Sequence, residues 1–287
     1  MAVTKLITRK LKNQVFYVRL YYTNMKIGII GLGMVGSAVR HGFNRIGQHV
    51  SGFDIKMPET KLEDTLSSEL LFVCVPTPAL PDGSCDTSIV RGVVAKLTKS
   101  KYLGLVVIKS TVEPGTTDQL SRQYPELRLT FCPEFLRERA QYVDFVEYHH
   151  VCIIGTHNDK DYELLKEAHG SLPKNFSKMT PLEAELSKYY WNVFNALRIV
   201  YANQFYDVCK AVGADYQKIK NALVKHPNIP DVYLEANDNF RGFSGNCLPK
   251  DTKAFARYTA SHHVGEWNFS IFDGIVEINK IYRPTVL

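Results

Sequence analysis

A glycine-rich turn near the start of the chain constrains the fold more than any other feature. Gly31, Gly33 and Gly36 follow a short apolar run at 26–30 and open a helix-like segment. Glycines at this spacing allow a tight strand-to-helix turn, a close approach of a pyrophosphate to the backbone, and close packing of helix on strand. Asp54 ends the next strand candidate, where a carboxylate accepts hydrogen bonds from an adenosine ribose and repels a 2′-phosphate. The pattern predicts NAD rather than NADP; an ordinary tight turn, the alternative, does not require the acid.

Short apolar runs alternate with helical stretches over the first half of the chain. The runs are β-branched and nearly continuous, as in strands buried on both faces of a parallel sheet. Helices between them indicate βαβ units. We therefore expect an α/β fold in which a Rossmann-type parallel-sheet domain occupies residues 25–180. The expected strands are 26–30, 49–54, 70–75, 105–108, 127–131 and 151–154.

A different pattern begins after Pro181. Apolar residues recur every few positions from Leu182 to Val208, which predicts one helix of about seven turns that ends near Gly213. We expect a mainly helical domain over 181–287, with this helix as a spine. Such a long apolar helix has more surface than a small domain covers, so we expect a homodimer. Shorter helices are expected at 216–224, 251–261 and 269–281.

The net charge of +6 originates in a basic N-terminal extension, residues 1–24, which holds five basic residues and no acid. The rest of the chain then carries 30 basic residues against 29 acidic ones, so we expect no nucleic-acid partner. We favour a non-native or misassigned start, or an unstructured arm; an organelle presequence is the alternative. No apolar run reaches the ~20 residues of a membrane span, so we expect no membrane partner. The basic residues are Lys5, Arg9, Lys10, Lys12 and Arg19.

Six cysteines occur without a CxxC pair or a regular framework. This usage favours reduced thiols in a reducing compartment, and we expect a cytoplasmic protein. No group of cysteine and histidine residues has metal-ligand spacing, so we expect no metal. The cysteines are Cys74, Cys85, Cys132, Cys152, Cys209 and Cys247.

Three more loops follow strand candidates, at the edge where open α/β sheets bind their ligands. Residues 75–78 read Val-Pro-Thr-Pro, residues 109–112 read Lys-Ser-Thr-Val, and residues 132–138 read Cys-Pro-Glu-Phe-Leu-Arg-Glu. Each sequence is compatible with an ordinary loop. Their shared location favours a functional interpretation.

Two pairs of polar residues occur four positions apart. Glu134 and Glu138 would share one face of a helical turn, where one carboxyl group can act as general acid and the other as general base. Lys188 and Asn192 share a face of the long helix, where an ammonium and an amide can stabilise an oxyanion. From spacing alone, a solvated face is the better interpretation of both pairs.

The segment 242–251 reads Gly-Phe-Ser-Gly-Asn-Cys-Leu-Pro-Lys-Asp. Pro249 fits the first turn of a helix, which places Cys247 near a helix N-terminus. That position lowers a thiol pKa and favours the thiolate. Asp251, one turn further, can take or relay a proton. A buried structural cysteine is the alternative.

Taken together, these segments resemble the UDP-glucose/GDP-mannose dehydrogenase family from Met25 to about residue 280. The motifs that carry the resemblance occur in order at 31–36, 75–78, 109–111, 133–138, 184–192 and 245–251. The resemblance implies a four-electron, NAD-dependent oxidation of a nucleotide-sugar primary alcohol to a carboxylate, of the UDP-glucose to UDP-glucuronate type. Cys247 would carry the thiohemiacetal and thioester, and Glu134 or Glu138 would assist hydrolysis.

The resemblance also implies roles for individual residues. The implied catalytic residues are Cys247, Lys188, Asn192, Asp251, Glu134 and Thr111. The implied cofactor-binding residues are Gly31, Gly33, Met34, Val35, Asp54, Val75, Pro76, Thr77, Ser110, Thr111, Glu138 and Lys250. The implied substrate contacts are Glu134, Phe135, Leu136, Lys188, Asn192, Gly242, Phe243 and Ser244.

The chain departs from the family pattern in several places. It ends where the connecting helix would lead into a second Rossmann-like domain that binds the substrate nucleotide. Ser244 replaces a glycine, the stretch between Asp54 and Leu70 is short, and Arg241 is the candidate for an arginine that crosses to a neighbouring subunit. Two alternatives therefore stay open. One is a single-step hydroxy-acid dehydrogenase without a thiol nucleophile, and the other is a truncated, non-catalytic or partner-dependent NAD-binding dimer.

Overall fold

The structure, a computed structural model, describes residues 3–11, 14–22, 24–262 and 269–283; the side chains of residues 1–23 lie outside the description. The basic residues expected in the N-terminal extension are among them. The chain packs as two compact units. We call residues 1–77 and 87–188 the sheet unit, and residues 78–86 and 189–287 the helical unit.

A seven-stranded sheet forms the centre of the sheet unit, in the order β4-β3-β5-β6-β7-β8-β9. β3, β4, β5, β6 and β7 are parallel, as expected, which confirms the α/β fold. The strands are β3 (Lys26–Ile30), β4 (His49–Phe53), β5 (Leu70–Val73), β6 (Leu105–Ile108), β7 (Arg128–Phe131), β8 (Cys152–Gly155) and β9 (Phe176–Met179).

Two features of this sheet differ from the expectation. β8 runs antiparallel to β7, and the two strands share one residue pair, Phe131 with Gly155. β9 was not expected; it pairs with β8 in parallel at the edge of the sheet. Among the neighbouring strands of this sheet, β7 and β8 therefore share the fewest residue pairs.

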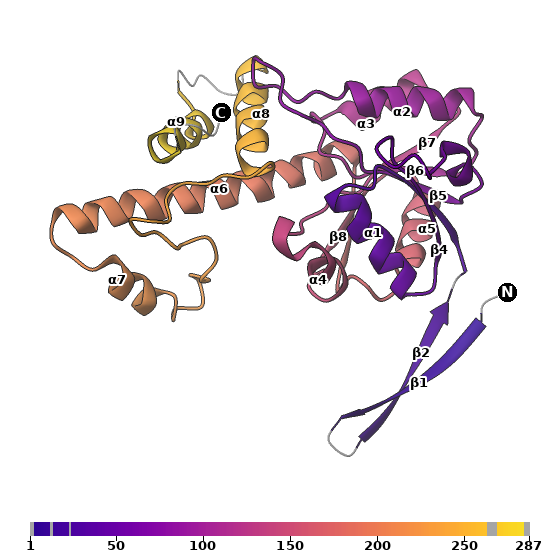
Figure 1. The fold of residues 1–287 in the computed structure, drawn as a ribbon, viewed down its shortest axis with the longest axis horizontal. Coiled ribbons are helices and arrows are strands. Elements are labelled where there is room, and N and C mark those ends of the chain that lie inside the picture. The colour runs from indigo at the N-terminus through magenta and orange to yellow at the C-terminus, as the bar shows by residue number, and fades with distance from the viewer. Residues whose placement is uncertain (1–2, 12–13, 23, 263–268, 284–287) are drawn as a thin grey trace. The chain divides into compact units, whose positions relative to one another are not determined.

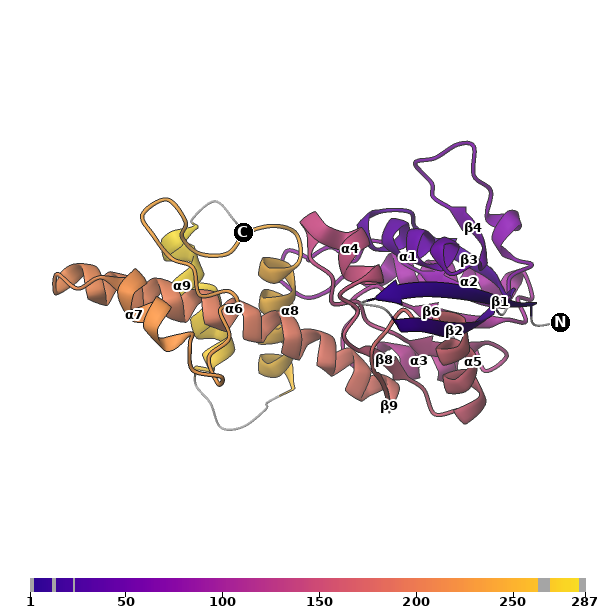
Figure 2. The same cartoon turned by 90° about the horizontal axis from the view of Figure 1, so that it is seen from below.

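Helices cover both faces of the sheet because alternate strand residues point to opposite sides. Leu70 and Phe72 of β5 enter one core with α1, α4 and α5, whereas Leu71 and Val73 enter a second core with α2 and α3. Figures 1 and 2 show these two helical layers. The helices are α1 (Met34–Arg45), α2 (Ser88–Lys99), α3 (Thr116–Gln123), α4 (Gln141–Val146) and α5 (Asp159–His169), with 3-10 turns η1 (Leu62–Thr65) and η2 (Glu138–Ala140).

The long helix α6 (Pro181–Ala211) has 31 residues, somewhat more than the expected seven turns. Its later part packs in the helical unit through Val193, Ala196 and Val200, against Phe243 and Ile275. The other helices of this unit are α7 (Tyr216–Leu223), α8 (Leu248–Ser261) and α9 (Ile271–Tyr282).

The N-terminal residues form an antiparallel hairpin rather than an arm without secondary structure. β1 (Val3–Leu11) pairs with β2 (Gln14–Tyr22). This hairpin is separate from the seven-stranded sheet.

Candidate functional site

The glycine turn has the geometry that a bound dinucleotide requires. Gly31 has φ +91°, and a Cβ there would lie 2.6 Å from the carbonyl oxygen of Cys74. A Cβ at Gly36 would lie 1.9 Å from the carbonyl oxygen of Gly31, so both positions exclude a side chain. A Cβ at Gly33 would meet nothing within 4 Å. Gly33 is also the N-cap of α1 and no side chain caps that helix, so its N-terminus is open to a phosphate.

Asp54 is fixed beside this turn by backbone donors. Its Oδ2 accepts the N–H of Leu32 at 2.7 Å and its Oδ1 accepts the N–H of Lys56 at 2.9 Å. The N–H of Gly31 donates to the carbonyl of Phe53 at 2.8 Å, which joins the ends of β3 and β4. A carboxylate has lone pairs left after two such bonds, so Asp54 can still accept hydrogen bonds from the ribose hydroxyls of NAD.

The loops after β5 and β6 meet at the same edge. Ser110 Oγ donates to the carbonyl of Val75 at 2.7 Å, and the N–H of Ser110 donates to Val73. Thr77 is buried, Thr111 is half-buried and Pro76 is exposed. The structure thus places the expected cofactor-binding loops beside the glycine turn, at the carboxyl ends of the parallel strands. Met34 and Val35 open α1 there.

Glu134, which follows β7, is buried and paired with Lys109. Lys109 Nζ lies 3.2 Å from Glu134 Oε2, and the two side chains are 0% and 6% exposed. Burial alone would raise the pKa of Glu134, but the charges of Lys109 and His149 outweigh it and lower that pKa. Glu134 is therefore ionised and a weak base at neutral pH. The sequence analysis had not singled out Lys109, although it lies in the 109–112 motif.

The pairing of Glu134 with Glu138 on one helical turn is wrong. Residues 132–137 have no helical structure, and the 3-10 turn η2 begins only at Glu138. Glu134 is buried whereas Glu138 is exposed, so spacing of four does not bring the two acids to one face. The Pro133 that follows Cys132 restricts the backbone of this stretch, which gives the physical reason.

Lys188 on α6 reaches the loop that holds Glu134. Its Nζ donates to the carbonyl oxygen of Glu134 at 2.5 Å and lies 5.6 Å from the centre of the Phe135 ring. Leu136 is half-buried in the same loop. The sheet unit therefore presents an ammonium and the 134–136 loop together.

The helical unit assembles a second set of expected residues. Cys247 is the N-cap of α8 and half-buried, with Pro249 in the first turn, as expected. The buried carboxylate of Asp251 accepts from Asn192 Nδ2 at 2.5 Å, and Lys250 Nζ lies 2.5 Å from its other oxygen. Burial acts to lower the pKa of Lys250, but Asp251, Cys85 and Cys247 together raise it.

The loop before Cys247 holds Gly242, Phe243 and Ser244, the three expected substrate contacts, and they differ in exposure. Phe243 is 4% exposed and packs in the core of the helical unit, with its N–H donating to Asn279 Oδ1 at 2.8 Å. Gly242 is buried with φ +59°, so Ser244 is the member of the expected trio that is exposed. Arg241 donates to Asp207 at 2.5 Å within its own unit.

Three residues that the sequence analysis did not group meet inside the sheet unit. The ligand atoms of Cys132, Cys152 and His169 lie within 4.8 Å of one another, and all three residues are buried. The expectation that no metal binds rested on ligand spacing along the chain, whereas these three residues come together in space. The spacing along the chain gave no signal because the cluster is made by strand order rather than by a local motif.

Known proteins match most of the chain. Residues 56–172 match the NAD binding domain of the UDP-glucose/GDP-mannose dehydrogenase family, and residues 182–281 match the central domain of that family. The cofactor predicted from the glycine turn and Asp54 is thus the one that the family domain binds. Among the helices that the structure describes, none combines the length and apolar character of a membrane span.

Individual relatives agree with the family match. A UDP-glucose 6-dehydrogenase of Rickettsia bellii is 28% identical over 78% of this chain and 52% of its own length, so the chain spans about half of that relative. The solved structure of a UDP-glucose dehydrogenase from Pyrobaculum islandicum aligns with a TM-score of 0.81 at 28% identity, over 90% of this chain and 68% of that chain. A Mycobacterium tuberculosis 3-hydroxyisobutyrate dehydrogenase shares the fold, with a TM-score of 0.71 at 14% identity over 92% of this chain and 95% of that chain. The protein belongs to the UDP-glucose/GDP-mannose dehydrogenase family.

Proposed function

We propose that this chain oxidises the primary alcohol of a nucleotide sugar to a carboxylate with NAD, as in the conversion of UDP-glucose to UDP-glucuronate. The names of its relatives support the substrate class. The observation that carries the proposal is the placement of Cys247 at the N-terminus of α8, one turn before a buried Asp251 that Asn192 hydrogen-bonds. A thiol at a helix N-terminus is activated toward a carbonyl carbon.

The chain's residues would divide the work as follows. NAD, when bound along the glycine turn, supplies the hydride acceptor for both oxidations. Lys188 and Asn192 stabilise the substrate oxygen as it becomes anionic. Asp251, with Thr111 and an ordered water, takes the proton that the alcohol loses.

Cys247 accounts for the second oxidation. Its sulfur forms a bond to the aldehyde carbon and the thiol proton passes to the carbonyl oxygen, which retains the aldehyde as a thiohemiacetal. Loss of a hydride to a second NAD and of the hydroxyl proton to a base leaves a thioester. Water then adds to the carbonyl carbon, the carbon–sulfur bond breaks, and the thiol takes back a proton as the carboxylate leaves. Glu134 or Glu138 would assist that hydrolysis.

The domain limits and the compartment belong to the same proposal. We place the NAD-binding domain at 25–180 and the helical domain at 181–287; the ends of the two family matches, at residues 172 and 182, support this division. All six cysteines are thiols in the structure, which supports a reducing, cytoplasmic location.

The direct test is the amount of NADH formed per sugar across a panel of UDP- and GDP-sugars. We expect two NADH per sugar from the wild type and at most one from Cys247→Ala, because the aldehyde is no longer retained. Cys209→Ala is the matched control, since Cys209 is buried in α6 and packs on Tyr216. Two NADH per sugar from Cys247→Ala would rule out the thiol mechanism.

A single-step hydroxy-acid dehydrogenase is the second enzymatic candidate. The 3-hydroxyisobutyrate dehydrogenase that shares the fold over nearly its whole length favours it. That reaction uses the lysine–asparagine pair but no thiol. Turnover of a small hydroxy acid that Cys247→Ala leaves unchanged, with no turnover of any nucleotide sugar, would select this candidate. NAD binding with no turnover of either class would instead select the non-catalytic dimer.

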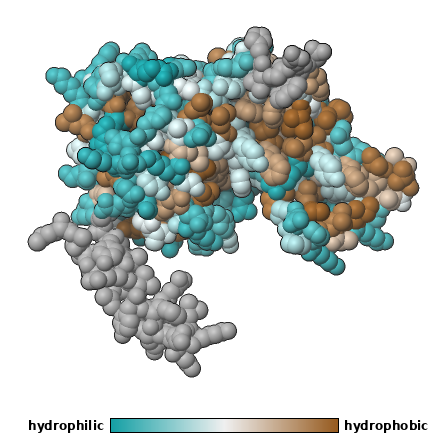
Figure 3. Space-filling view, turned by 180° about the vertical axis from the view of Figure 1, so that it is seen from behind, coloured by the Kyte–Doolittle hydropathy of each residue, from teal (hydrophilic) through white to brown (hydrophobic). Residues whose placement is uncertain are grey.

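We propose further that the helical unit forms a homodimer through α6. Figure 3 shows apolar surface on this unit, and several large apolar residues on α6 are exposed with spacings of three, four and seven. Such a stripe is typical of a helix that packs against another helix. The stripe residues are Tyr190, Phe194, Tyr201, Phe205 and Val208.

Light scattering tests this interface. We expect a dimer mass for the wild type at micromolar concentration and a monomer mass for the double variant Tyr201→Glu/Val208→Glu. Ile55→Glu, an exposed apolar residue in the sheet unit, is the control and should remain dimeric. A monomeric wild type would exclude the interface.

A further inference from the structure

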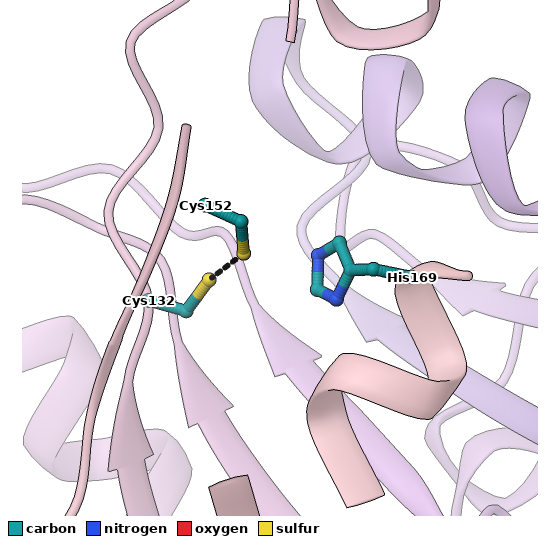
Figure 4. Close-up of side chains that lie close together, drawn as sticks. All are labelled: Cys132, Cys152 and His169. Atoms are coloured by element: carbon teal, nitrogen blue, oxygen red, sulfur yellow. Dashed lines mark hydrogen bonds between the residues drawn. The ribbon is translucent and has the colours of Figure 1, made fainter. Parts of the chain in front are cut away.

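The three buried residues that meet in the sheet unit have the arrangement of metal ligands. Cys132 directly follows β7, Cys152 begins β8 and His169 ends α5. The two sulfur atoms lie 3.7 Å apart. Figure 4 shows the imidazole ring of His169 facing both sulfurs. Three elements thus deliver three side chains to one point between the sheet and α5.

His169 has one ring nitrogen without a hydrogen-bond partner. Its Nδ1 lies 2.8 Å from the carbonyl oxygen of Leu165, which can only accept, so Nδ1 carries the proton. Nε2 therefore has a lone pair, and among the described residues no donor reaches it, although His169 is 0% exposed. An unsatisfied buried acceptor destabilises the folded state unless a ligand satisfies it. A backbone carbonyl that fixes one nitrogen while the other faces thiols is the usual setting of a histidine that binds a metal.

The sulfur spacing matches a tetrahedral ion. With Zn–S bonds of about 2.3 Å and a tetrahedral angle, two thiolates on one zinc are roughly 3.8 Å apart. The observed 3.7 Å agrees with that spacing, and it is also the length of the S–H···S hydrogen bond between the two thiols when no ion is bound; a disulfide requires sulfur atoms about 2.05 Å apart. We propose that Cys132 Sγ, Cys152 Sγ and His169 Nε2 bind one zinc ion.

The charges around the cluster suit a divalent cation. Two thiolates and the Glu134 carboxylate would carry three negative charges, and Lys109 carries one positive charge, which leaves two to be balanced. Lys109 Nζ is 3.4 Å from Cys132 Sγ and 3.2 Å from Glu134 Oε2.

The position of the site indicates its purpose. β7 and β8 share a single residue pair, so few backbone hydrogen bonds join the antiparallel edge of the sheet to the parallel strands. A zinc ion bound by Cys132 and Cys152 would cross-link these two strands, and His169 would attach α5. Cys132 is two residues before Glu134, so the cross-link would also fix the loop that Lys188 contacts. The site is structural and independent of the proposed oxidation.

Zinc and cobalt binding by the full chain, purified without a histidine tag under reducing conditions, tests the inference. We expect one zinc per chain by elemental analysis, and a Co²⁺ complex with thiolate charge-transfer bands and the intense visible bands of tetrahedral cobalt. The double variant Cys132→Ser/Cys152→Ser should lose the bound ion and those bands. Cys209→Ala should keep both, since Cys209 lies in the helical unit.

Other outcomes would overturn the site. Wild-type protein that retains no zinc after dialysis against Zn²⁺, or that gives an octahedral Co²⁺ spectrum without charge-transfer bands, excludes it. Equal zinc content in wild type and the double variant would mean adventitious binding elsewhere. If the double variant does not fold, the wild-type cobalt spectrum still decides, together with His169→Leu, which should weaken zinc binding by at least about tenfold.

Discussion

Each unit of the molecule pairs one lysine with one buried carboxylate, and the two pairs differ in their surroundings. In the sheet unit, the side chains of Lys109 and Glu134 are 0% and 6% exposed, so both are buried. In the helical unit, Lys250 is 19% exposed, and its partner Asp251 also accepts from Asn192. The first pair is closed to solvent, and the second is partly open.

This difference in solvent exposure suggests different roles for the two lysine–carboxylate pairs. The charge of Lys109 contributes to the low pKa of Glu134, and a carboxylate with a low pKa is a poor proton acceptor. Asp251 lies one turn beyond Cys247 in α8, and its backbone N–H donates to the carbonyl of Cys247 at 2.9 Å. We infer that the closed pair mainly fixes the 134–136 loop and leaves Glu134 a weak base for thioester hydrolysis, whereas the open pair takes the proton that the alcohol loses.

The largest expected effect is on turnover in Asp251→Asn. The amide keeps the size of the carboxylate but cannot take a proton, so we expect kcat to fall by about 10²- to 10⁴-fold. Steady-state NADH production with the best nucleotide sugar measures the loss. Circular dichroism should show that the variant is folded.

Two further variants make this test specific. Glu277→Gln, at an exposed carboxylate of α9 paired with Lys280, should retain wild-type turnover. Glu134→Gln should lose less kcat than Asp251→Asn. A greater loss in Glu134→Gln would reverse the roles assigned to the two pairs.

The next effect is on stability in Lys109→Met. The substitution leaves the Glu134 carboxylate buried without its counter-charge, which costs about 3 to 5 kcal/mol. The Tm should fall by roughly 10 °C for a domain of this size. Differential scanning calorimetry measures the shift.

Lys250→Met is the matched control for that change. Its lysine is partly exposed and Asp251 keeps its bond from Asn192, so the Tm should fall by less than in Lys109→Met. The double variant Lys109→Met/Glu134→Gln should recover part of the lost stability, because no buried charge remains. Equal losses in the two lysine variants would show that burial does not distinguish the pairs.

The sequence predicted those features that depend on near neighbours in the chain. The turn at Gly31 follows from steric limits within a few residues, and the place of Cys247 follows from Pro249, two positions away. The six expected strands were all found, and four of them differ from the predicted limits by one or two residues at a start or an end. Their nearly continuous apolar runs carry a strong signal.

The features that the sequence did not predict depend on strand order and edges. β9 reads Phe-Ser-Lys-Met and lies partly exposed at an edge, so it lacks the continuous apolar run of a central strand. Cys132 meets Cys152 because β8 lies beside β7 in an antiparallel direction, which no local pattern encodes. The family resemblance implied a substrate contact for Phe243, and its ring packs in the core of the helical unit, a burial that the loop sequence does not indicate.

Another buried carboxylate, Glu185 on α6, has no lysine partner among the residues that the structure describes, and it gives the smallest expected effect. Its Oε1 accepts the N–H and the hydroxyl of Thr117 at 2.8 and 2.6 Å, and its Oε2 accepts the N–H of Gly115 at 2.5 Å. Burial raises the pKa of Glu185 to about 7, even though these three donors favour the charged form. Without a cation, burial dominates, in contrast to Glu134.

The sign of the pH dependence follows from that raised pKa. The folded state binds a proton on Glu185 that the unfolded state releases above pH 4.5, so this group adds most stability below pH 4.5 and loses it as the pH rises to about 7. The full change is roughly 3 kcal/mol. Urea unfolding of wild type and Glu185→Gln across this range isolates the effect, because other carboxylates titrate in both proteins. We expect the stability of wild type relative to Glu185→Gln to decrease with rising pH; a constant difference would mean that the three donors offset burial as fully as a lysine does.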